Sequence, residues 1–286
     1  MNPVLSQYEK SDGFAYQEGR AAYAKASGTA PTAVPTATAA PAPAAPPAGT
    51  PTDFDYVTAA GGARLTINDV VVKTAMLFVV TVIFAVIGWN TVAAMPWVLW
   101  VGMIGGLVLG LVNAFKRVPS PGLILLYGVF EGLFLGGISQ WYNEFAMGSG
   151  YEGIVLQAVV ATMTTFGVML ALYLTGIIKV NKKFVSIMIV AAVSYMLLGI
   201  ASLVAALFGV GDGWGFYGIT GLGLIICVVG VLIAAFFLLL DFEAIAQGIR
   251  MGAPERESWR MAFGLTVTLV WLYLEFLRLL AVFTRN

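Results

Sequence analysis

The sequence of 286 residues contains no histidine, a single cysteine and few charges. Without histidine there is no Ser-His-Asp machinery, no histidine-ligated metal or haem, and no imidazole proton relay. The one cysteine, Cys227, excludes an internal disulfide and a cysteine metal cluster. Charged residues make up only 10% of the chain, against about 25% in a soluble domain. These absences exclude a water-soluble globular protein and leave carboxylates as the groups that titrate.

Most of the remaining sequence is apolar, with 59% hydrophobic residues and a mean hydropathy of +0.89. From residue 66 onward, apolar runs recur that are each close to the roughly 20 residues a helix needs to cross a bilayer. They cover residues 70–89, 97–115, 122–142, 154–178, 184–208, 218–240 and 261–283. Because lipid offers no partner for unpaired backbone groups, each run is predicted to be a helix. The expected fold class is all-α, a polytopic membrane protein with a seven-transmembrane-helix bundle.

The first 65 residues differ in kind from the rest. Residues 29–52 consist almost wholly of Ala, Pro and Thr, with no charge and no aromatic ring. Frequent proline removes backbone donors and favours extended geometry, so this stretch cannot build a packed core. We therefore predict a disordered, Ala/Pro/Thr-rich cytoplasmic tail over residues 1–65 and a transmembrane domain over residues 66–286.

The positive charges orient the predicted bundle. Basic residues lie in the tail and in the connections after the second, fourth and sixth spans: Lys116, Arg117, Lys179, Lys182, Lys183, Arg250, Arg256 and Arg260. The connections after the first, third and fifth spans hold none. This alternation places the N-terminus in the cytoplasm and, after the last crossing, the C-terminus outside. Fifteen Lys and Arg balance fifteen Asp and Glu, so there is no basic field to attract nucleic acid. The apolar spans indicate the lipid bilayer as the partner.

Two series of glycines predict how the helices meet. In the second span and again in the third, glycines stand four residues apart: Gly102, Gly106, Gly110, Gly128, Gly132 and Gly136. Small residues at this interval form a groove where another helix backbone can approach closely. We expect both series to form helix contacts.

Three acidic residues fall inside apolar spans, where an ionisable group costs about 2.5–3.5 kcal/mol on insertion scales. Glu131 lies near the middle of the third span, Asp241 closes the apolar part of the sixth, and Glu275 lies deep in the seventh. The functional interpretation is a proton or cation site inside the bundle. The structural alternatives are that Asp241 marks the water interface and that Arg278, one helical turn later, neutralises Glu275. Glu131 has no basic residue in its span, so it needs a partner from another helix or a proton.

The segments that surround these acids are FEGLFLGGIS, LLLDFEAI and LVWLYLEFLRLL. Together with the spans and their charge pattern, they resemble the Bax inhibitor-1/YccA family, specifically its bacterial members with long Ala/Pro-rich tails. The resemblance covers residues 66–285 and implies a seven-helix bundle with the last helix central, in a bacterial plasma membrane. It also implies a pH-sensitive calcium leak, in which acids of the sixth and seventh spans, here Asp241 and Glu275, share a proton.

The resemblance adds further expectations. Lys116 and Arg117, at the end of the second span, resemble the region that supplies a latch arginine, and Arg278 is a further candidate for an ion pair. Some bacterial members are described as modulators of a membrane-bound ATP-dependent protease, so such a protease is a candidate partner. The sequence departs from the family in that Glu275 stands where better-studied relatives have aspartate.

The spacing of Asp241 and Glu275 bears on whether they pair. If the turn lies near Pro254, Asp241 precedes it by 13 residues and Glu275 follows it by 21. In straight antiparallel helices this mismatch separates their depths by about 12 Å at 1.5 Å per residue. A direct contact then requires a bend nearer Ser258, and Glu131 is the alternative partner for either acid.

A pair of acids at this depth would respond to protons and to cations. Carboxylates held close together in a low dielectric cannot both ionise cheaply, and they titrate as a unit. Protonated, they can share a hydrogen bond; ionised, they repel and admit a divalent cation. Calcium takes about 6–8 oxygen ligands. Asp241 and Glu275, with waters and carbonyls, therefore predict a weak, transient calcium site and no permanent cofactor.

Two functions from different classes remain, and neither is enzymatic. The first is a passive leak pathway for calcium or other cations that protonation gates. The second is a non-conducting regulator of a membrane-bound protease or other membrane machinery, contacted through the tail. The GVGD string at residues 209–212 matches the GxGD motif of intramembrane aspartyl proteases, but it falls in a connection. No nucleophile–base pair or cofactor motif is visible, so we expect no enzyme.

Overall fold

Long helices make up most of the described part of the chain. The computed structural model describes residues 63–218 and 221–285, so the predicted tail over residues 1–65 lies outside it except for its last three residues. The helices are α3 (Ile67–Thr91), α4 (Trp97–Phe115), α5 (Pro121–Gly148), α6 (Ile154–Leu174), α7 (Lys182–Leu207), α8 (Leu222–Arg250) and α9 (Ser258–Arg285), with 3-10 turns η1 (Gly215–Gly218) and η2 (Glu255–Glu257). Within the described ranges, 7 helices are long and apolar enough to cross a membrane, and there is no strand. The all-helical, seven-span prediction is confirmed.

Local sequence signals set several helix ends. Thr66 caps α3: its hydroxyl accepts from the Asp69 N–H at 3.2 Å, and the Asp69 carboxylate accepts from the Thr66 N–H at 3.0 Å. Pro121 occupies the first turn of α5, where its missing N–H is not needed. α6 ends at Leu174, before the predicted end at residue 178, because Gly176 adopts a φ of +67° and terminates the helix.

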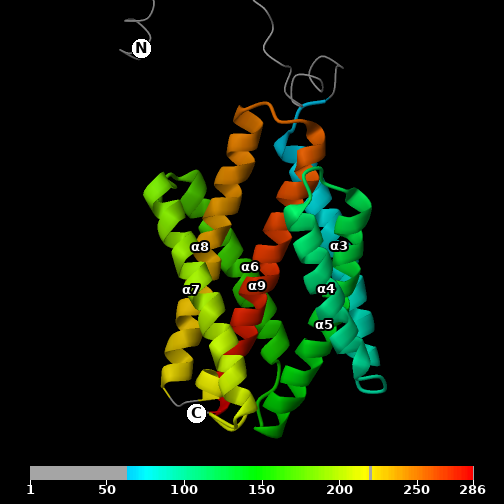
Figure 1. Ribbon diagram of the computed structural model, residues 1–286, viewed down its shortest axis with the longest axis vertical. Helices are drawn as coiled ribbons and strands as arrows, with labels where there is room; N and C mark the ends of the chain where they lie inside the picture. The colour runs from blue at the N-terminus through cyan, green and yellow to red at the C-terminus, as the bar shows by residue number, and fades with distance from the viewer. Residues whose placement is uncertain (1–62, 219–220, 286) are drawn as a thin grey trace, which may run out of the picture. The chain divides into compact units, whose positions relative to one another are not determined.

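α9 is the central helix. It packs against α3, α5, α6 and α8, and Figure 1 shows it in red between α7 and α8 on one side and α3, α4 and α5 on the other. Its buried residues lie on several faces: Ala262, Phe263, Leu265, Thr266, Leu272, Glu275, Leu277 and Ala281. α3, α4, α6 and α7 instead expose many large apolar side chains, as helices that face lipid do. The predicted central position of the last helix is therefore confirmed.

Both glycine series form close helix contacts, as predicted. Gly132 and Gly136 of α5 face α3 so closely that a Cβ at either position would overlap backbone atoms of that helix. Gly102 of α4 faces α5, where a Cβ would stand 2.6 Å from the backbone nitrogen of Phe134. α5 is thus held between α3 and α4. Close backbone packing of this kind stabilises helix pairs in lipid, where apolar burial alone gives no preference for protein over lipid contacts.

The segment before α3 is fixed to the turn between α8 and α9. The Leu65 N–H donates to the Ala253 carbonyl at 2.8 Å, and the Glu255 N–H donates to the Ala63 carbonyl at 2.8 Å. Residues 63–65, which were predicted as part of the tail, therefore contact the helical bundle. We call this end of the bundle, which also carries the α4–α5 and α6–α7 connections, the inner end, after the predicted orientation. The opposite end is the outer end.

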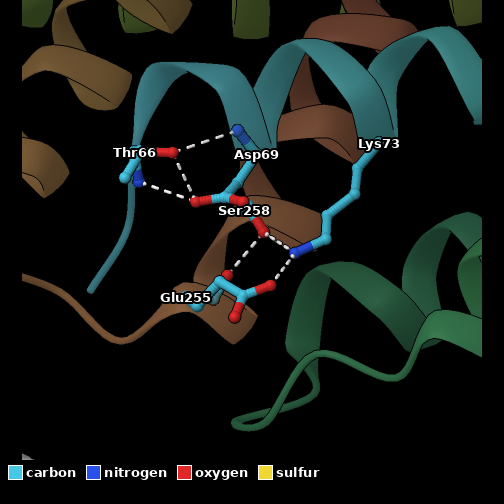
Figure 2. Close-up of polar contacts among 5 residues, drawn as sticks. All are labelled: Thr66, Asp69, Lys73, Glu255 and Ser258. Atoms are coloured by element: carbon cyan, nitrogen blue, oxygen red, sulfur yellow. Dashed lines mark hydrogen bonds and ion pairs between the residues drawn. The ribbon is translucent and has the colours of Figure 1, made fainter. Parts of the chain in front are cut away.

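A half-buried lysine also contacts this turn. Lys73 of α3 donates its ammonium to Glu255 Oε1 at 2.8 Å and to Ser258 Oγ at 2.7 Å (Figure 2). The same ammonium lies 5.8 Å from the ring centroid of Trp259. Residues separated by more than 180 positions in the sequence thus form one polar cluster at the inner end.

Candidate functional site

Glu275 is the most deeply buried of the three predicted acids, with 2% of its surface exposed. Tyr195 of α7 donates its hydroxyl to Oε2 at 2.8 Å, and Trp271 Nε1 donates to Oε1 at 3.0 Å. Arg278 Nη1 donates to both carboxylate oxygens at 3.1 Å. The carboxylate therefore has a cation and two further donors, and its charge is compensated inside the bundle.

Aromatic side chains surround the cation of this pair. The Arg278 guanidinium lies 4.6 Å from the ring centroid of Tyr217 in η1, and the Tyr142 hydroxyl of α5 also interacts with it. The pair thus joins α9 to α5, α7 and η1 near the outer end. Removing one partner of a buried ion pair typically costs about 3–5 kcal/mol, because the other charge is left uncompensated. This geometry is that of a fixed structural contact.

Asp241 has a different environment. Its Oδ2 atom is buried and has no hydrogen-bond partner. The carboxyl group faces α9 beside Thr268 and Gly264, and a Cβ on Gly264 would stand 3.7 Å from Oδ1. Among the described residues no Lys or Arg forms an ion pair with Asp241. Ionisation of this carboxyl therefore places a charge in an apolar interior without a compensating cation.

The two acids of α8 and α9 lie at different depths. Asp241 faces Thr268 of α9, whereas Glu275 faces Gly230 of α8. The two levels are separated by the stretch from Thr268 to Glu275 on α9 and by the stretch from Gly230 to Asp241 on α8. At 1.5 Å per residue, these stretches correspond to a difference in depth of about 10–16 Å. α8 ends at Arg250 and α9 begins at Ser258, so the turn is centred near Pro254. With the bend there, and not nearer Ser258, the structure places Asp241 and Glu275 apart and forms no hydrogen bond between them.

Apolar side chains fill the α8–α9 interface between the levels of the two acids. They are Ala234 and Leu238 of α8 and Leu272 of α9, and all belong to one buried cluster. Leu238 and Leu272 are completely enclosed. An apolar layer therefore separates the levels of the two acids along this interface.

Glu131 lies at a separate position, between α4 and α5. It is buried, and a Cβ on Gly106 of α4 would stand 2.6 Å from its Oε2 atom. The hydroxyl of Tyr127, four residues earlier on α5, interacts with its carboxyl group. In the described ranges it forms no ion pair and no hydrogen bond with Asp241 or Glu275. The structure therefore does not bring the three predicted acids together.

A family model described as Bax inhibitor 1 like matches residues 2–285. The chain belongs to the Bax inhibitor 1-like family. This match confirms the family inferred from the three acidic segments and is consistent with a multi-span membrane protein. Comparison with curated proteins finds no match.

In this Bax inhibitor 1-like chain, the end of α4 is held through its backbone. Arg260 Nη2 of α9 donates to the carbonyl oxygens of Lys116 at 3.3 Å and of Arg117 at 2.6 Å, while its Nε donates to Glu257 at 2.8 Å. The side chains of Lys116 and Arg117 form no ion pair with a described residue. Arg260 therefore binds the predicted latch residues Lys116 and Arg117 at the inner end, and it does so through their backbone carbonyl groups.

The metal-binding expectation can be compared with the available donors. Across the ranges that the structure describes, no group of three or more His, Cys, Asp or Glu side chains could hold a metal ion. Asp241 offers one carboxylate near the Thr268 hydroxyl, and Glu275 already binds the cationic Arg278. These donors fall short of the 6–8 oxygens that calcium prefers. A transient calcium contact at Asp241 and Glu275 stays a prediction.

Sequence reasoning missed the neutral partners of Glu275. Trp271 precedes it by one helical turn, so helical spacing on α9 contained a signal for this contact. Tyr195 belongs to α7, 80 residues earlier, and no sequence pattern connects the two positions. The GVGD string lies in the turn after α7, where Asp212 has a φ of +54°, so Asp212 falls outside the membrane-spanning helices.

Proposed function

We propose that the chain is a cation leak protein of the membrane, gated by protonation of Asp241 at the α8–α9 interface. The observation that carries this proposal is the buried Oδ2 of Asp241, which has no hydrogen-bond partner. An isolated carboxylate is costly to keep ionised in hydrocarbon, whereas the protonated acid is neutral. The protonation state of Asp241 is therefore coupled to how closely α8 packs against α9.

Charged side chains at the inner end of α8 and on the neighbouring helices form ion pairs with one another. The ion pairs are Lys73 with Glu255, Arg250 with Glu243, and Arg260 with Glu257, and Tyr173 of α6 also donates to Glu243 at 2.8 Å. None of these contacts compensates a charge on Asp241. At low pH the neutral acid leaves α8 and α9 packed. As the pH rises, the ionised acid favours a hydrated, separated interface, so cation flux should increase with pH.

Glu275 has a second role in this proposal. Because Arg278, Tyr195 and Trp271 already bind its carboxylate, Glu275 holds the outer end of α9 in place while the inner part of the interface responds to pH. The apolar layer between the acids, which includes Leu238 and Leu272, is the barrier that must open. Gating therefore depends on Asp241 alone and needs no proton shared with Glu275.

Calcium flux into liposomes that contain the full chain and an entrapped indicator tests the proposal. The wild-type protein should conduct more at alkaline than at acidic pH. Asp241→Asn, which keeps the shape but cannot ionise, should stay at the acidic level at every pH. Glu152→Gln, an exposed acid in the α5–α6 connection, is the matched control and should keep the wild-type pH dependence. An Asp241→Asn variant with wild-type pH dependence contradicts the proposal.

The alternative function predicts a different result in the same assay. If the wild-type chain gives no flux above protein-free liposomes at any pH, a leak function is excluded. The chain is then better described as a non-conducting regulator of a membrane-bound protease or other membrane machinery. Deletion of residues 1–60 should in that case abolish regulation, because the predicted tail is the proposed contact for such a partner.

A further inference from the structure

A pocket of about 340 Å³ lies on the opposite side of α9 from Asp241. Its floor consists of buried residues of α5 and α9, among them Leu135 and Leu269, each 9% exposed. Its rims belong to α3 and α6, where Val86 is 58% and Met163 is 41% exposed. This difference in exposure places the mouth between α3 and α6, open toward the surroundings of the bundle.

The hydroxyl groups in the pocket wall already have partners. The hydroxyls of Thr81, Thr162 and Thr266 each donate to the carbonyl four residues earlier, at 2.7–2.9 Å. Ser139 of α5 and Tyr273 of α9 form a hydrogen bond with each other at 2.6 Å. Apolar cavities remain dry, and one of about 150 Å³ is large enough to take up benzene. The pocket therefore suits an apolar occupant, not water or an ion.

The position of the pocket identifies that occupant. Along α3 the lining runs from Phe78 to Asn90, about 18 Å at 1.5 Å per residue, close to one leaflet of the roughly 30 Å hydrocarbon core. Trp89 and Asn90 lie at its outer end, and tryptophan is enriched where hydrocarbon meets the headgroups. In a bilayer, a mouth at this depth faces the acyl chains.

We propose that this pocket binds one acyl chain of a phospholipid, with the headgroup at the level of Asn90. The lipid inserts between α3 and α6 and contacts the central helix α9 directly at Leu269 and Thr266. This site goes beyond the proposed ion leak and does not depend on it. A lipid held here differs from lipid at the surface of the bundle, because it reaches residues that are buried behind α3 and α6.

Photo-crosslinking with the full chain in liposomes tests this site. The probe is a phosphatidylcholine that carries a diazirine near the end of one acyl chain, and adducts are mapped by mass spectrometry. Adducts are expected on the floor residues Leu135 and Leu269 as well as on exposed residues of all lipid-facing helices. Adducts restricted to exposed side chains overturn the proposal. The proposal is also overturned if the floor residues carry no adducts and the rim residues crosslink to a second copy of the chain.

A filling variant makes the test specific. Val159 is a rim residue of α6 that is 39% exposed, and Val159→Trp should occupy the pocket. Floor adducts should then fall by about tenfold, equivalent to about 1.4 kcal/mol of binding free energy. Val193→Trp on α7, where Val193 is 47% exposed and lies outside the pocket, is the matched control and should leave floor adducts unchanged. Floor adducts that persist in Val159→Trp contradict the proposal, and the wild-type map remains decisive if that variant does not fold.

Discussion

Gly230 of α8 lies directly against the carboxylate of Glu275, because a Cβ at position 230 would stand 2.6 Å from Glu275 Oε2. Gly106 of α4 has the same relationship to Glu131, again at 2.6 Å from Oε2. In both cases a glycine on the neighbouring helix provides the space that a buried carboxylate occupies. Glycines in these helices therefore serve two purposes, close helix packing and the accommodation of acids.

Gly230→Ala should destabilise the protein, because the new methyl group displaces both Glu275 and the Tyr195 hydroxyl that binds it. Forcing an extra methyl into a packed site typically costs about 1–3 kcal/mol. Thermal unfolding in detergent micelles measures the loss. Gly199→Ala on α7 is the matched control, since a Cβ there meets nothing within 4 Å. Equal unfolding temperatures for the two variants would contradict the close contact between Gly230 and Glu275.

Arg278→Gln should destabilise the fold far more than Arg250→Gln. The first change leaves the Glu275 carboxylate, 2% exposed, without its cation, which typically costs about 3–5 kcal/mol. The second breaks the ion pair with Glu243, in which Arg250 is 62% exposed, and exposed pairs contribute about 0–1 kcal/mol. In chemical denaturation, the double variant Arg278→Gln/Glu275→Gln should recover part of the stability. No recovery would show that the two side chains do not interact as a pair.

The spans were predictable because each apolar run is long enough to cross a membrane. The offset between Asp241 and Glu275 was predictable as well, since Pro254 indicates the turn and helical rise converts residue number into depth. The extension of α8 beyond its apolar run was not predictable from hydropathy. The run ends at residue 240, whereas α8 continues to Arg250 and buries Phe242 and Ile245 in its charged inner part.

The contacts between helices could not be predicted, because hydropathy contains no information about which helices are neighbours. Tyr195 reaches Glu275 only because α7 lies beside α8 and α9. The pocket floor at Leu135 and Leu269 exists only because α3 and α6 leave a gap over α5 and α9. The glycine series indicated close contacts and were right, yet they did not identify the partner of either helix.

Lys73→Met should loosen the attachment of α3 to the turn between α8 and α9. The change keeps the apolar stem and removes the ammonium that binds Glu255 and Ser258 (Figure 2). Hydrogen bonds to charged groups contribute about 1.5–3 kcal/mol, and Ser258 is fully buried, so a loss in this range is expected in the free energy of unfolding. Lys183→Met, at an exposed position at the start of α7, should change stability little. A Lys73→Met variant as stable as this control would rule out a stabilising role for the cluster.

Arg260→Ala should free the α4–α5 connection from α9, whereas Arg117→Ala should not. Arg260 donates to the backbone carbonyls of Lys116 and Arg117, so the acceptors remain when the Arg117 side chain is removed. Amide hydrogen exchange over residues 116–120 should therefore become faster in Arg260→Ala and stay at the wild-type rate in Arg117→Ala, because loss of this contact promotes local opening. Arg260→Lys cannot reproduce the forked guanidinium geometry and should restore protection only in part. The reverse pattern, with faster exchange in Arg117→Ala alone, would assign the contact to the basic side chains of α4 and remove Arg260 from the latch.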